Sequence, residues 1–348
     1  MARRQMRKII IRKPGGYAAL ELLEQPDPTP AAGEVLIAVE ACGVNYADGI
    51  IRMGLYASAR ELHGYPITPG FEIAGTVAAV GAGVTEFNSG DAVVAITLFG
   101  GYCDRIVLPV GNVFHRPLGL TAGQAAGLPT VFLTAWFMIH RQLHPRVGER
   151  WLVHSAAGGV GSALTQLGAL AGCEVTAVVG SGHKCTHCVN MGAKTVIDKS
   201  TTPLWATAEA LEPNGFEAIF DANGVSTLKQ SYAHLAPTGR LVIYGFHSML
   251  PKDGRLNWLR LGWDWLRTPR FNPLDMTQNN RSVLAANLSF LQSHSEDLRE
   301  GMRWLLQRFA DGRLQALPIE AFPLNQAAAA QARLESGQTL GKLVLLTA

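Results

Sequence analysis

A glycine-rich stretch at residues 156–161, AAGGVG, has the composition of a turn that lets an anion approach the backbone. It follows a predicted strand, RWLVHSA, and opens a predicted helix over about 159–171. In that context Gly158 lets the backbone approach a pyrophosphate, Gly161 allows close packing of helix on strand, and the first helical amides face the anion. Ala156 stands where the first glycine of such a fingerprint is usual. A simple tight turn is the alternative, and the regular strands and helices around the motif favour the dinucleotide site.

The second strand of this region predicts which dinucleotide binds. In sites for NAD an acidic residue about 20 positions after the glycines accepts a hydrogen bond from the ribose. Here the corresponding stretch, VVGSGHK, contains no acid. Ser181 and Lys184 offer a hydroxyl and a cation to a 2′-phosphate, and Lys199 adds a second cation after the strand TVID. We therefore expect NADPH as the cofactor; a solvated helix position for Lys184 is the alternative.

Composition narrows the class of protein. The 348 residues are 48% hydrophobic and 16% charged, so the chain can bury a large core. A net charge of +3 without a run of basic residues argues against nucleic acid as a partner. The apolar part of the basic N-terminal stretch is only residues 9–11, which is too short for a signal peptide, and the five cysteines are odd in number and scattered. We expect a soluble, cytoplasmic chain with reduced thiols.

The order of predicted elements changes along the chain. Residues 1 to about 120 contain short β-type runs, EVLIAVEAC, FEIAGTVAAVG, DAVVAI and CDRIVLP, between Gly, Pro and Asp turns. From about 150 onward, near-continuous Val, Ile and Leu strands alternate with helices, which predicts a doubly wound parallel sheet covered on both faces. The closing segments, including GKLVLLTA, look like strands that return to the first, β-rich unit.

Several motifs together carry a family resemblance over nearly the whole chain: GVNYADGIIRMGLY (43–56), TPGFEIAGTV (68–77), LTAW (133–136), AAGGVG, GRLVIYG and the terminal GKLVLL. With them the chain resembles the medium-chain dehydrogenase/reductase superfamily, in its zinc-free quinone oxidoreductase branch. FNPLDMTQNNRSVLAANLSFL (271–291) is similar to the vesicle amine transport protein 1 subgroup. The resemblance implies an α/β fold with a GroES-like catalytic domain over 1–124 and a Rossmann NADP-binding domain over 125–270. Residues 271–348 would close the sheet and return to the catalytic domain.

Two positions indicate whether the chain binds zinc. Zinc-dependent members of the superfamily place a cysteine where this chain has Asn45 and a histidine where it has Phe71, and neither replacement is a good zinc ligand. The four-cysteine lobe of those members is also missing, since only Cys103 lies between residues 80 and 120. HKCTHC (183–188) contains a single CxxC pair, which is weak evidence for a metal. We expect no metal.

Roles for individual residues are carried over from the resemblance. Asn45 would lie near the nicotinamide and the substrate, Thr134 near the nicotinamide ribose or carboxamide, and Lys342 would approach the nicotinamide end from the C-terminus. The pyrophosphate, the 2′-phosphate and the crevice at the strand ends would be lined by residues from the turns: Gly158, Gly159, Val160, Gly161, Ser181, Lys184, Lys199, Asn223, Gly245 and Phe246. Lys199 departs from the family, which more often has a tyrosine there.

The expected reaction is hydride transfer without a metal. Hydride would pass from the nicotinamide to the β-carbon of an enone or to a quinone ring, and the oxygen that gains charge needs donors. Asn45, Tyr56 and the ribose hydroxyls are the candidates, and Tyr56 is a candidate proton donor, although a phenol is a modest acid. Ile50 stands where quinone reductases of this branch often have a tyrosine, which makes the pocket more apolar and counts against quinone as the substrate. We expect a zinc-independent, NADPH-dependent reductase that forms a homodimer.

A second class of function remains open because of residues 254–271. This stretch, GRLNWLRLGWDWLRTPRF, places Trp258, Trp263 and Trp265 among arginines, which suits a membrane surface or an acidic partner. A lid over the substrate site or an oligomer contact would have the same composition. The alternative is a membrane- or partner-associated protein with weak or vestigial reductase activity.

Overall fold

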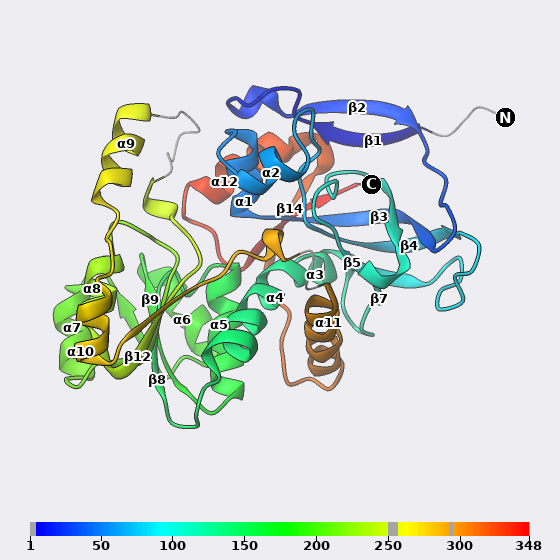
Figure 1. Cartoon of the computed structure of the whole chain (residues 1–348). Coiled ribbons are helices and arrows are strands. Elements are labelled where there is room, and N and C mark those ends of the chain that lie inside the picture. The colour runs from blue at the N-terminus through cyan, green and yellow to red at the C-terminus, as the bar shows by residue number, and fades with distance from the viewer. Residues whose placement is uncertain (1–4, 250–256, 292–294, 348) are drawn as a thin grey trace. The chain divides into compact units, whose positions relative to one another are not determined.

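The computed structural model describes residues 5–249, 257–291 and 295–347 (Figure 1). Contacts divide the chain into two compact units. Unit 1 takes in the described residues up to 133 and from 289 onward, and unit 2 takes in those from 134 to 288. The C-terminal segment thus belongs to the same unit as the N-terminal one, and the expected boundaries at 124 and 270 lie within units 1 and 2 respectively.

Unit 1 is built on a seven-stranded mixed sheet in the order β14-β15-β3-β4-β5-β7, with β6 paired to β3. The strands are β3 (Glu34–Val44), β4 (Glu72–Val80), β5 (Ala92–Ile96), β6 (Arg105–Pro109), β7 (Val113–His115), β14 (Ile319–Pro323) and β15 (Lys342–Leu346). A separate antiparallel pair joins β1 (Gln5–Ile10) and β2 (Glu21–Pro26). A Cβ on Gly75 would lie 2.1 Å from the carbonyl oxygen of Ala38, so glycine permits the close approach of β4 to the bulge in β3.

Helices complete unit 1: α1 (Tyr46–Arg52), α2 (Ala57–Leu62), α3 (Ala122–Ala126), α11 (Ser295–Ala310) and α12 (Ala327–Glu335), together with the start of α4 (Pro129–Phe137). Arg52 and Glu335 form a buried ion pair of 2.7 Å that joins α1 to α12. Among the described residues one helical segment, Ala122–Leu143, is long and apolar enough to cross a membrane, but 72% of it is buried inside the protein. That burial is typical of a core helix.

Unit 2 contains a six-stranded parallel sheet in the order β10-β9-β8-β11-β12-β13. The strands are β8 (Arg150–Val153), β9 (Glu174–Val179), β10 (Thr195–Asp198), β11 (Phe216–Asp221), β12 (Leu235–Ile243) and β13 (Ser282–Ala285). The helices are α5 (Gly159–Leu170), α6 (Cys185–Asn190), α7 (Leu204–Leu211), α8 (Leu228–Ala233), α9 (Trp258–Arg267) and α10 (Pro273–Asn279). This confirms the predicted doubly wound parallel sheet.

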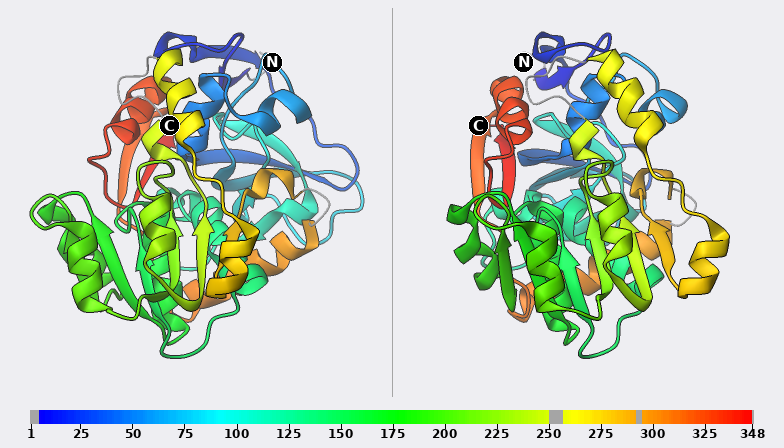
Figure 2. Two further views of the ribbon diagram at one scale, coloured as in Figure 1. Left: turned by 60° about the vertical axis from the view of Figure 1, so that its left-hand side comes forward. Right: turned by 90° about the vertical axis from the view of Figure 1, so that its left-hand side faces the viewer.

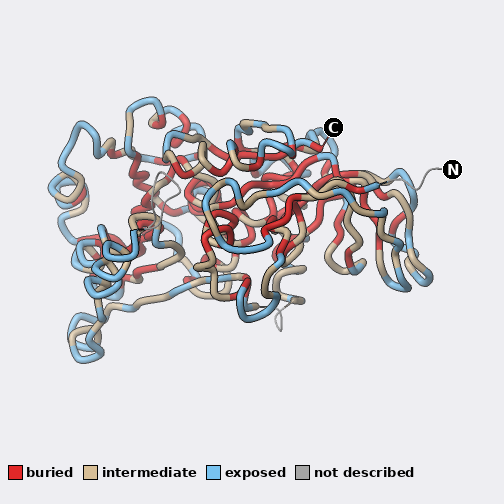
Figure 3. The backbone as a smooth tube through the Cα atoms, turned by 90° about the horizontal axis from the view of Figure 1, so that it is seen from above, coloured by how far each residue is buried: buried red, intermediate tan, exposed pale blue. Residues whose placement is uncertain are grey.

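Burial explains why the strands of unit 2 are nearly continuous in apolar residues. Leu152, Val178, Ile219 and Leu241 are all buried in one cluster, and helices flank the sheet on both faces (Figure 2). Buried stretches alternate with exposed ones along the backbone, and many of the outer turns of the tube are exposed (Figure 3). The strand order reverses between β8 and β11, and sheets of this kind bind their ligands at the carboxyl ends of the strands beside such a reversal.

Candidate active site

The glycine turn joins β8 to α5 at the reversal point. Gly158 precedes α5, whose first turn contains Gly159 and Val160. A Cβ on Gly161 would lie 2.4 Å from the carbonyl oxygen of Ser155 and 2.6 Å from the Cα of Ala156, and these backbone atoms have little freedom to move. Glycine at this position therefore allows α5 to pack directly against the end of β8, with its first amides open to an anion.

The neighbouring loop, after β11, is fixed by Asp221. The fully buried Asp221 carboxylate accepts hydrogen bonds from the backbone amides of Asn223 (2.8 Å) and Gly224 (3.1 Å). It also accepts from the hydroxyls of Thr227 (2.9 Å) and Ser231 (2.7 Å). These bonds hold Asn223 at the end of β11. The sequence prediction named Asn223 but not Asp221, although an acid that ends an apolar strand is a usable signal.

A hydrogen bond crosses the strand-order reversal. The Ser155 hydroxyl, after β8, donates to Oδ1 of Asn223, after β11, over 3.0 Å. The chain after β12 runs alongside, since the amide of His247 donates to the carbonyl of Ala222 over 3.0 Å. A Cβ on Gly245 would lie 2.8 Å from the same Ala222 oxygen, so glycine keeps the two strand ends close. The ends of β8, β11 and β12 thus form one continuous edge.

The side chain of Phe246 completes that edge. Phe246 is 42% exposed, and a Cβ on Gly224 would lie 2.7 Å from its ring. An exposed aromatic ring over a strand end offers an apolar surface to a planar ligand. The predicted residues Asn223, Gly245 and Phe246 therefore lie together.

Ser181, Lys184 and Lys199 also gather at one place in unit 2. The amide of Lys199 donates to the carbonyl of Val179 over 3.0 Å, which places the end of β10 beside the end of β9. A Cβ on Gly180 would lie 3.7 Å from the Lys199 side chain, and the Lys184 amide donates to Ser181 over 3.1 Å. Lys184 itself is largely buried. Ser181 and Lys184 thus come from the turn after β9, and Lys199 comes from the adjoining end of β10.

An acidic residue that is not part of the stretch VVGSGHK, Asp198, lies beside this turn. Oδ2 of Asp198, the last residue of β10, would be 3.3 Å from a Cβ on Gly182. Hydrogen bonds from Ser200 to Oδ1 hold the pKa of Asp198 below its ordinary value, so it is an anion at neutral pH. The turn therefore offers two lysines and one carboxylate rather than cations alone.

In unit 1 the strand register assembles a buried polar cluster. Leu343 of β15 pairs with Val44 of β3, and Cys42 of β3 pairs with Ile73 of β4. The residues next to these pairs, Lys342, Asn45 and Glu72, consequently meet. We call these three residues the unit 1 polar cluster.

Each member of the unit 1 polar cluster contacts the other two. Nζ of Lys342 lies 2.6 Å from Oε1 of Glu72 and donates to Oδ1 of Asn45 over 2.5 Å. Nδ2 of Asn45 donates to the same Glu72 oxygen over 2.8 Å, and the amide of Thr130 donates to Oε2 over 2.6 Å. The Lys342 and Glu72 side chains are 3% and 0% exposed. Lys342 and Asn45 were named from sequence and Glu72 was not.

Asp48 supports the cluster from α1. Its carboxylate accepts from the backbone amides of Asn45 (2.8 Å) and Gly70 (2.9 Å) and from the hydroxyl of Tyr102 (2.9 Å). Burial raises the pKa of Asp48 to about 7, against the opposing effect of these hydrogen bonds. Asp48 thereby fixes the backbone from which the Asn45 side chain projects.

Tyr56 and Thr134 are the remaining predicted residues. Tyr56 packs in an apolar cluster, with its ring edge-on to Phe71 at a centroid distance of 6.0 Å. Thr134 lies on α4. Within the described ranges, no three or more His, Cys, Asp and Glu side chains are grouped to hold a metal ion. Cys185 and Cys188 of the CxxC pair are free thiols.

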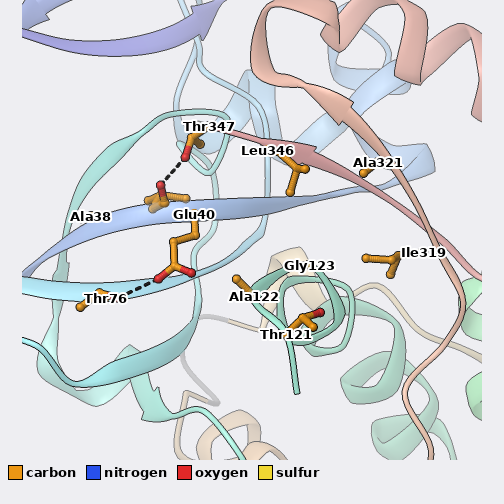
Figure 4. A pocket seen from close by; sticks show the side chains of 11 residues that line it. Ala38, Glu40, Thr76, Thr121, Ala122, Gly123, Ile319, Ala321, Leu346 and Thr347 are labelled. Atoms are coloured by element: carbon orange, nitrogen blue, oxygen red, sulfur yellow. Dashed lines mark hydrogen bonds between the residues drawn. The ribbon is translucent and has the colours of Figure 1, made fainter. Parts of the chain in front are cut away.

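One hollow in unit 1, of about 610 Å³, lies apart from the polar cluster, against β3, β15 and the start of α3 (Figure 4). Its polar side chains already bind one another or the backbone. Thr76 donates to Glu40 over 2.7 Å, Arg116 pairs with Glu40 at 3.6 Å, and Thr347 donates to the carbonyl of Val39. We therefore assign no ligand to this hollow.

Comparison with known proteins decides the family. Residues 31–128 match the alcohol dehydrogenase GroES-like domain, and residues 191–345 match the family described as zinc-binding dehydrogenase. The synaptic vesicle membrane protein VAT-1 homolog of Danio rerio is 31% identical over 344 residues, which cover 98% of this chain and 70% of that protein. The chain belongs to the VAT-1 homologue family. This confirms the predicted medium-chain dehydrogenase/reductase membership and the GroES-like and Rossmann fold.

Solved structures place this VAT-1 family member beside reductases. Escherichia coli quinone oxidoreductase complexed with NADPH has a TM-score of 0.84 and 26% identity, covering 98% of this chain and 100% of that one. The enoyl reductase CurK has a TM-score of 0.82 and 27% identity, covering 99% of each chain. The quinone oxidoreductase branch predicted from sequence is thus confirmed as the structural neighbourhood of this chain.

Proposed function

We propose that this VAT-1 family member is a zinc-independent, NADPH-dependent reductase of quinones or α,β-unsaturated carbonyls. The observation that carries the proposal is the glycine turn of unit 2, where a Cβ on Gly161 would lie 2.4 Å from the Ser155 carbonyl oxygen, so that glycine lets α5 begin directly against the end of β8. Lys184 and Lys199 stand at the next turn, where a 2′-phosphate would need cations. The NADPH complex of the similar Escherichia coli enzyme supports this choice of cofactor.

We assign the cofactor contacts mainly to residues of unit 2. The first amides of α5, around Gly158, Gly159, Val160 and Gly161, would bind the pyrophosphate. Ser181, Lys184 and Lys199 would hold the 2′-phosphate. Asn223, Gly245 and Phe246 would line the crevice at the strand ends, and Thr134 and Lys342 would contact the nicotinamide end. When bound, NADPH supplies the hydride.

The chain's own part in the reaction is to place donors where charge develops. Asn45 would donate a hydrogen bond to the substrate oxygen as it gains negative charge. Tyr56 is the candidate proton donor. Asn45 and Phe71 stand where zinc-dependent relatives have ligands, so the donors rather than a metal would stabilise the oxygen. Ile50 makes the substrate region apolar, which suits enones as well as quinones.

The proposal also covers the compartment and the oligomeric state of the protein. We propose that the protein acts in the cytoplasm as a homodimer joined through unit 2, whose sheet ends in the edge strand β13. An unpaired parallel edge offers backbone groups to a second copy. This assignment follows from the resemblance to the family.

Turnover tests the proposed function. Purified protein is expected to oxidise NADPH in the presence of phenanthrenequinone or a simple enone, and a zinc chelator should leave the rate unchanged. Loss of activity with the chelator would contradict zinc independence. Absence of turnover with every quinone and enone would contradict the reductase itself.

A second candidate function rests on α9, which displays an unusually apolar surface. Leu259, Trp263 and Leu266 follow one another at the spacing of one helical face and are 88%, 61% and 67% exposed. Arg260 and Arg267 flank this face, each one position after one of its leucines. Amphipathic helices with tryptophan and arginine bind membrane surfaces. The relatives named as synaptic vesicle membrane proteins make a lipid surface a reasonable second candidate.

Vesicle flotation tests this candidate. If α9 binds lipid, wild type should float with vesicles of phosphatidylserine and phosphatidylcholine, and the variant Trp263→Glu with Leu266→Glu should not, since charged side chains oppose insertion. Leu274→Glu on α10 is the matched control, because Leu274 is 73% exposed but lies outside α9. Equal flotation of both variants, or none by wild type, would exclude α9 as a membrane anchor.

A further inference from the structure

The side chains of Glu72 and Lys342 lie in a space that exists because two neighbouring residues are glycines. A Cβ on Gly43 would lie 2.2 Å from Oε1 of Glu72, and a Cβ on Gly127 would lie 2.9 Å from Cγ of Lys342. Neither glycine has a positive φ, so glycine is not needed here for a left-handed backbone. The missing Cβ instead leaves room for the side chains of Glu72 and Lys342. The buried ion pair is therefore built into the packing of unit 1.

The partners of Asn45 settle which way its amide faces. Lys342 can only donate and an ionised Glu72 can only accept, so Oδ1 of Asn45 must face Lys342 and Nδ2 must face Glu72. A flipped amide would place oxygen against carboxylate and NH₂ against ammonium. Nδ2 has a second hydrogen besides the one given to Glu72. The cluster thus orients one N–H of Asn45 toward another acceptor.

Charge explains why Glu72 is needed beside Lys342. A buried ammonium is costly unless an anion and further acceptors surround it. Glu72 at 2.6 Å supplies the anion, Asn45 supplies an acceptor, and Asp48 of α1 is the other charged group that acts on Lys342. Without Glu72, the buried Lys342 ammonium would lose the carboxylate in contact with it, and Nδ2 of Asn45 would lose the acceptor that fixes its direction.

We propose that Glu72 is the positioning residue of the reaction: its carboxylate fixes the Asn45 amide and pairs with the buried Lys342, so that Asn45 presents an oriented N–H to the substrate oxygen. This inference rests on the proposed reductase function. Glu72 transfers no proton and acts only through Asn45 and Lys342. The Thr130 amide, bound to the second carboxylate oxygen, ties the same group to the start of α4.

Glu72→Gln tests the proposal because it keeps the shape and removes the charge. We expect NADPH affinity to change less than about threefold, while kcat falls about 10²-fold, the usual loss when one oxyanion donor is misplaced. KM for the quinone or enone should change much less than kcat, because the lost interaction is one made to the substrate oxygen as it gains charge.

The apoprotein gives a readout that is independent of activity. In Glu72→Gln the Lys342 ammonium stays buried without the anion that pairs with it, so the variant should unfold at a lower temperature than wild type. The double variant Glu72→Gln, Lys342→Met should recover part of this loss, because it removes the buried charge together with its partner. Thermal unfolding of the apoproteins measures both effects.

Glu335→Gln is the matched control. It breaks an ion pair of the same kind, since Arg52 and Glu335 are 2.7 Å apart and 0% and 5% exposed, but it lies outside the polar cluster. It should lose stability and keep the wild-type kcat. If Glu72→Gln fails to fold, the double variant Glu72→Gln, Lys342→Met removes the unpaired charge and should fold while kcat stays low.

The outcomes separate the two proposals. A wild type that reduces no quinone or enone overturns the reductase function and the positioning role with it. An active wild type whose Glu72→Gln variant keeps the wild-type kcat overturns the positioning role alone. A loss of kcat as large in Glu335→Gln as in Glu72→Gln would show a general structural effect and would also overturn it.

Discussion

Replacing Lys184 with alanine is expected to weaken NADPH binding by about tenfold to a hundredfold and to leave NADH binding nearly unchanged. A charge-assisted hydrogen bond to a phosphate contributes about 1.5–3 kcal/mol, which corresponds to that range. Lys184 is only 9% exposed, so solvent screens its charge less than that of a surface lysine. Titration of the intrinsic tryptophan fluorescence with each cofactor measures the effect.

Lys194→Ala is the control for Lys184→Ala. Lys194 follows α6 in the same unit but pairs with Glu174 at an exposed site, 62% of the lysine side chain being accessible. Its removal should change neither affinity by more than about twofold, because exposed pairs contribute little. Equal losses of NADPH and NADH affinity in Lys184→Ala would contradict a 2′-phosphate contact and indicate a structural role for this lysine.

Replacing Gly161 with alanine is expected to abolish measurable cofactor binding and to destabilise unit 2 by about 1–3 kcal/mol. The added Cβ would meet the Ser155 carbonyl oxygen at 2.4 Å, so α5 must move away from β8 and its amides move with it. Thermal unfolding and cofactor titration on one preparation measure both effects.

Gly262→Ala is the control for Gly161→Ala. Gly262 lies in α9 of the same unit with no heavy atom within 4 Å of its added Cβ. Alanine there should be neutral or slightly stabilising, since alanine favours helix more than glycine does. A Gly161→Ala variant that binds NADPH like wild type would show that the turn has no part in binding the pyrophosphate.

The fold could be predicted because its signals are local. The apolar strands of unit 2 alternate with helices at short intervals, and Gly161 lies directly between a strand and a helix, so periodicity and turn residues were enough. Asn223, Gly245 and Phe246 could also be named, because each follows a strand and parallel strands end on the same edge.

The unit 1 polar cluster was only partly predictable because its contacts are distant in sequence. Lys342 and Asn45 are 297 positions apart, and the pairing of β15 with β3 alone brings them together. Glu72 was missed because an acid at the start of a strand is usually solvated, and only the fold shows it buried between Asn45 and Lys342. No local pattern carries that information.

Asp198 was missed for a related reason. The prediction of NADPH considered only the stretch after β9, which has no acid, whereas Asp198 reaches the same turn from the end of the adjacent β10. Strand order in a sheet decides such neighbours, and sequence order does not. The preference for a phosphorylated cofactor therefore depends on how far Lys184 and Lys199 outweigh this carboxylate.

The measurement that tests the central claim most directly is the affinity of the wild-type protein for NADPH and for NADH, side by side at one ionic strength. The account predicts NADPH binding at least about tenfold tighter, as one charge-assisted phosphate contact requires. Equal affinities, or tighter binding of NADH, would show that Asp198 dominates the turn and would contradict the NADPH-dependent function. Absence of binding by either cofactor would contradict the reductase and favour the membrane candidate.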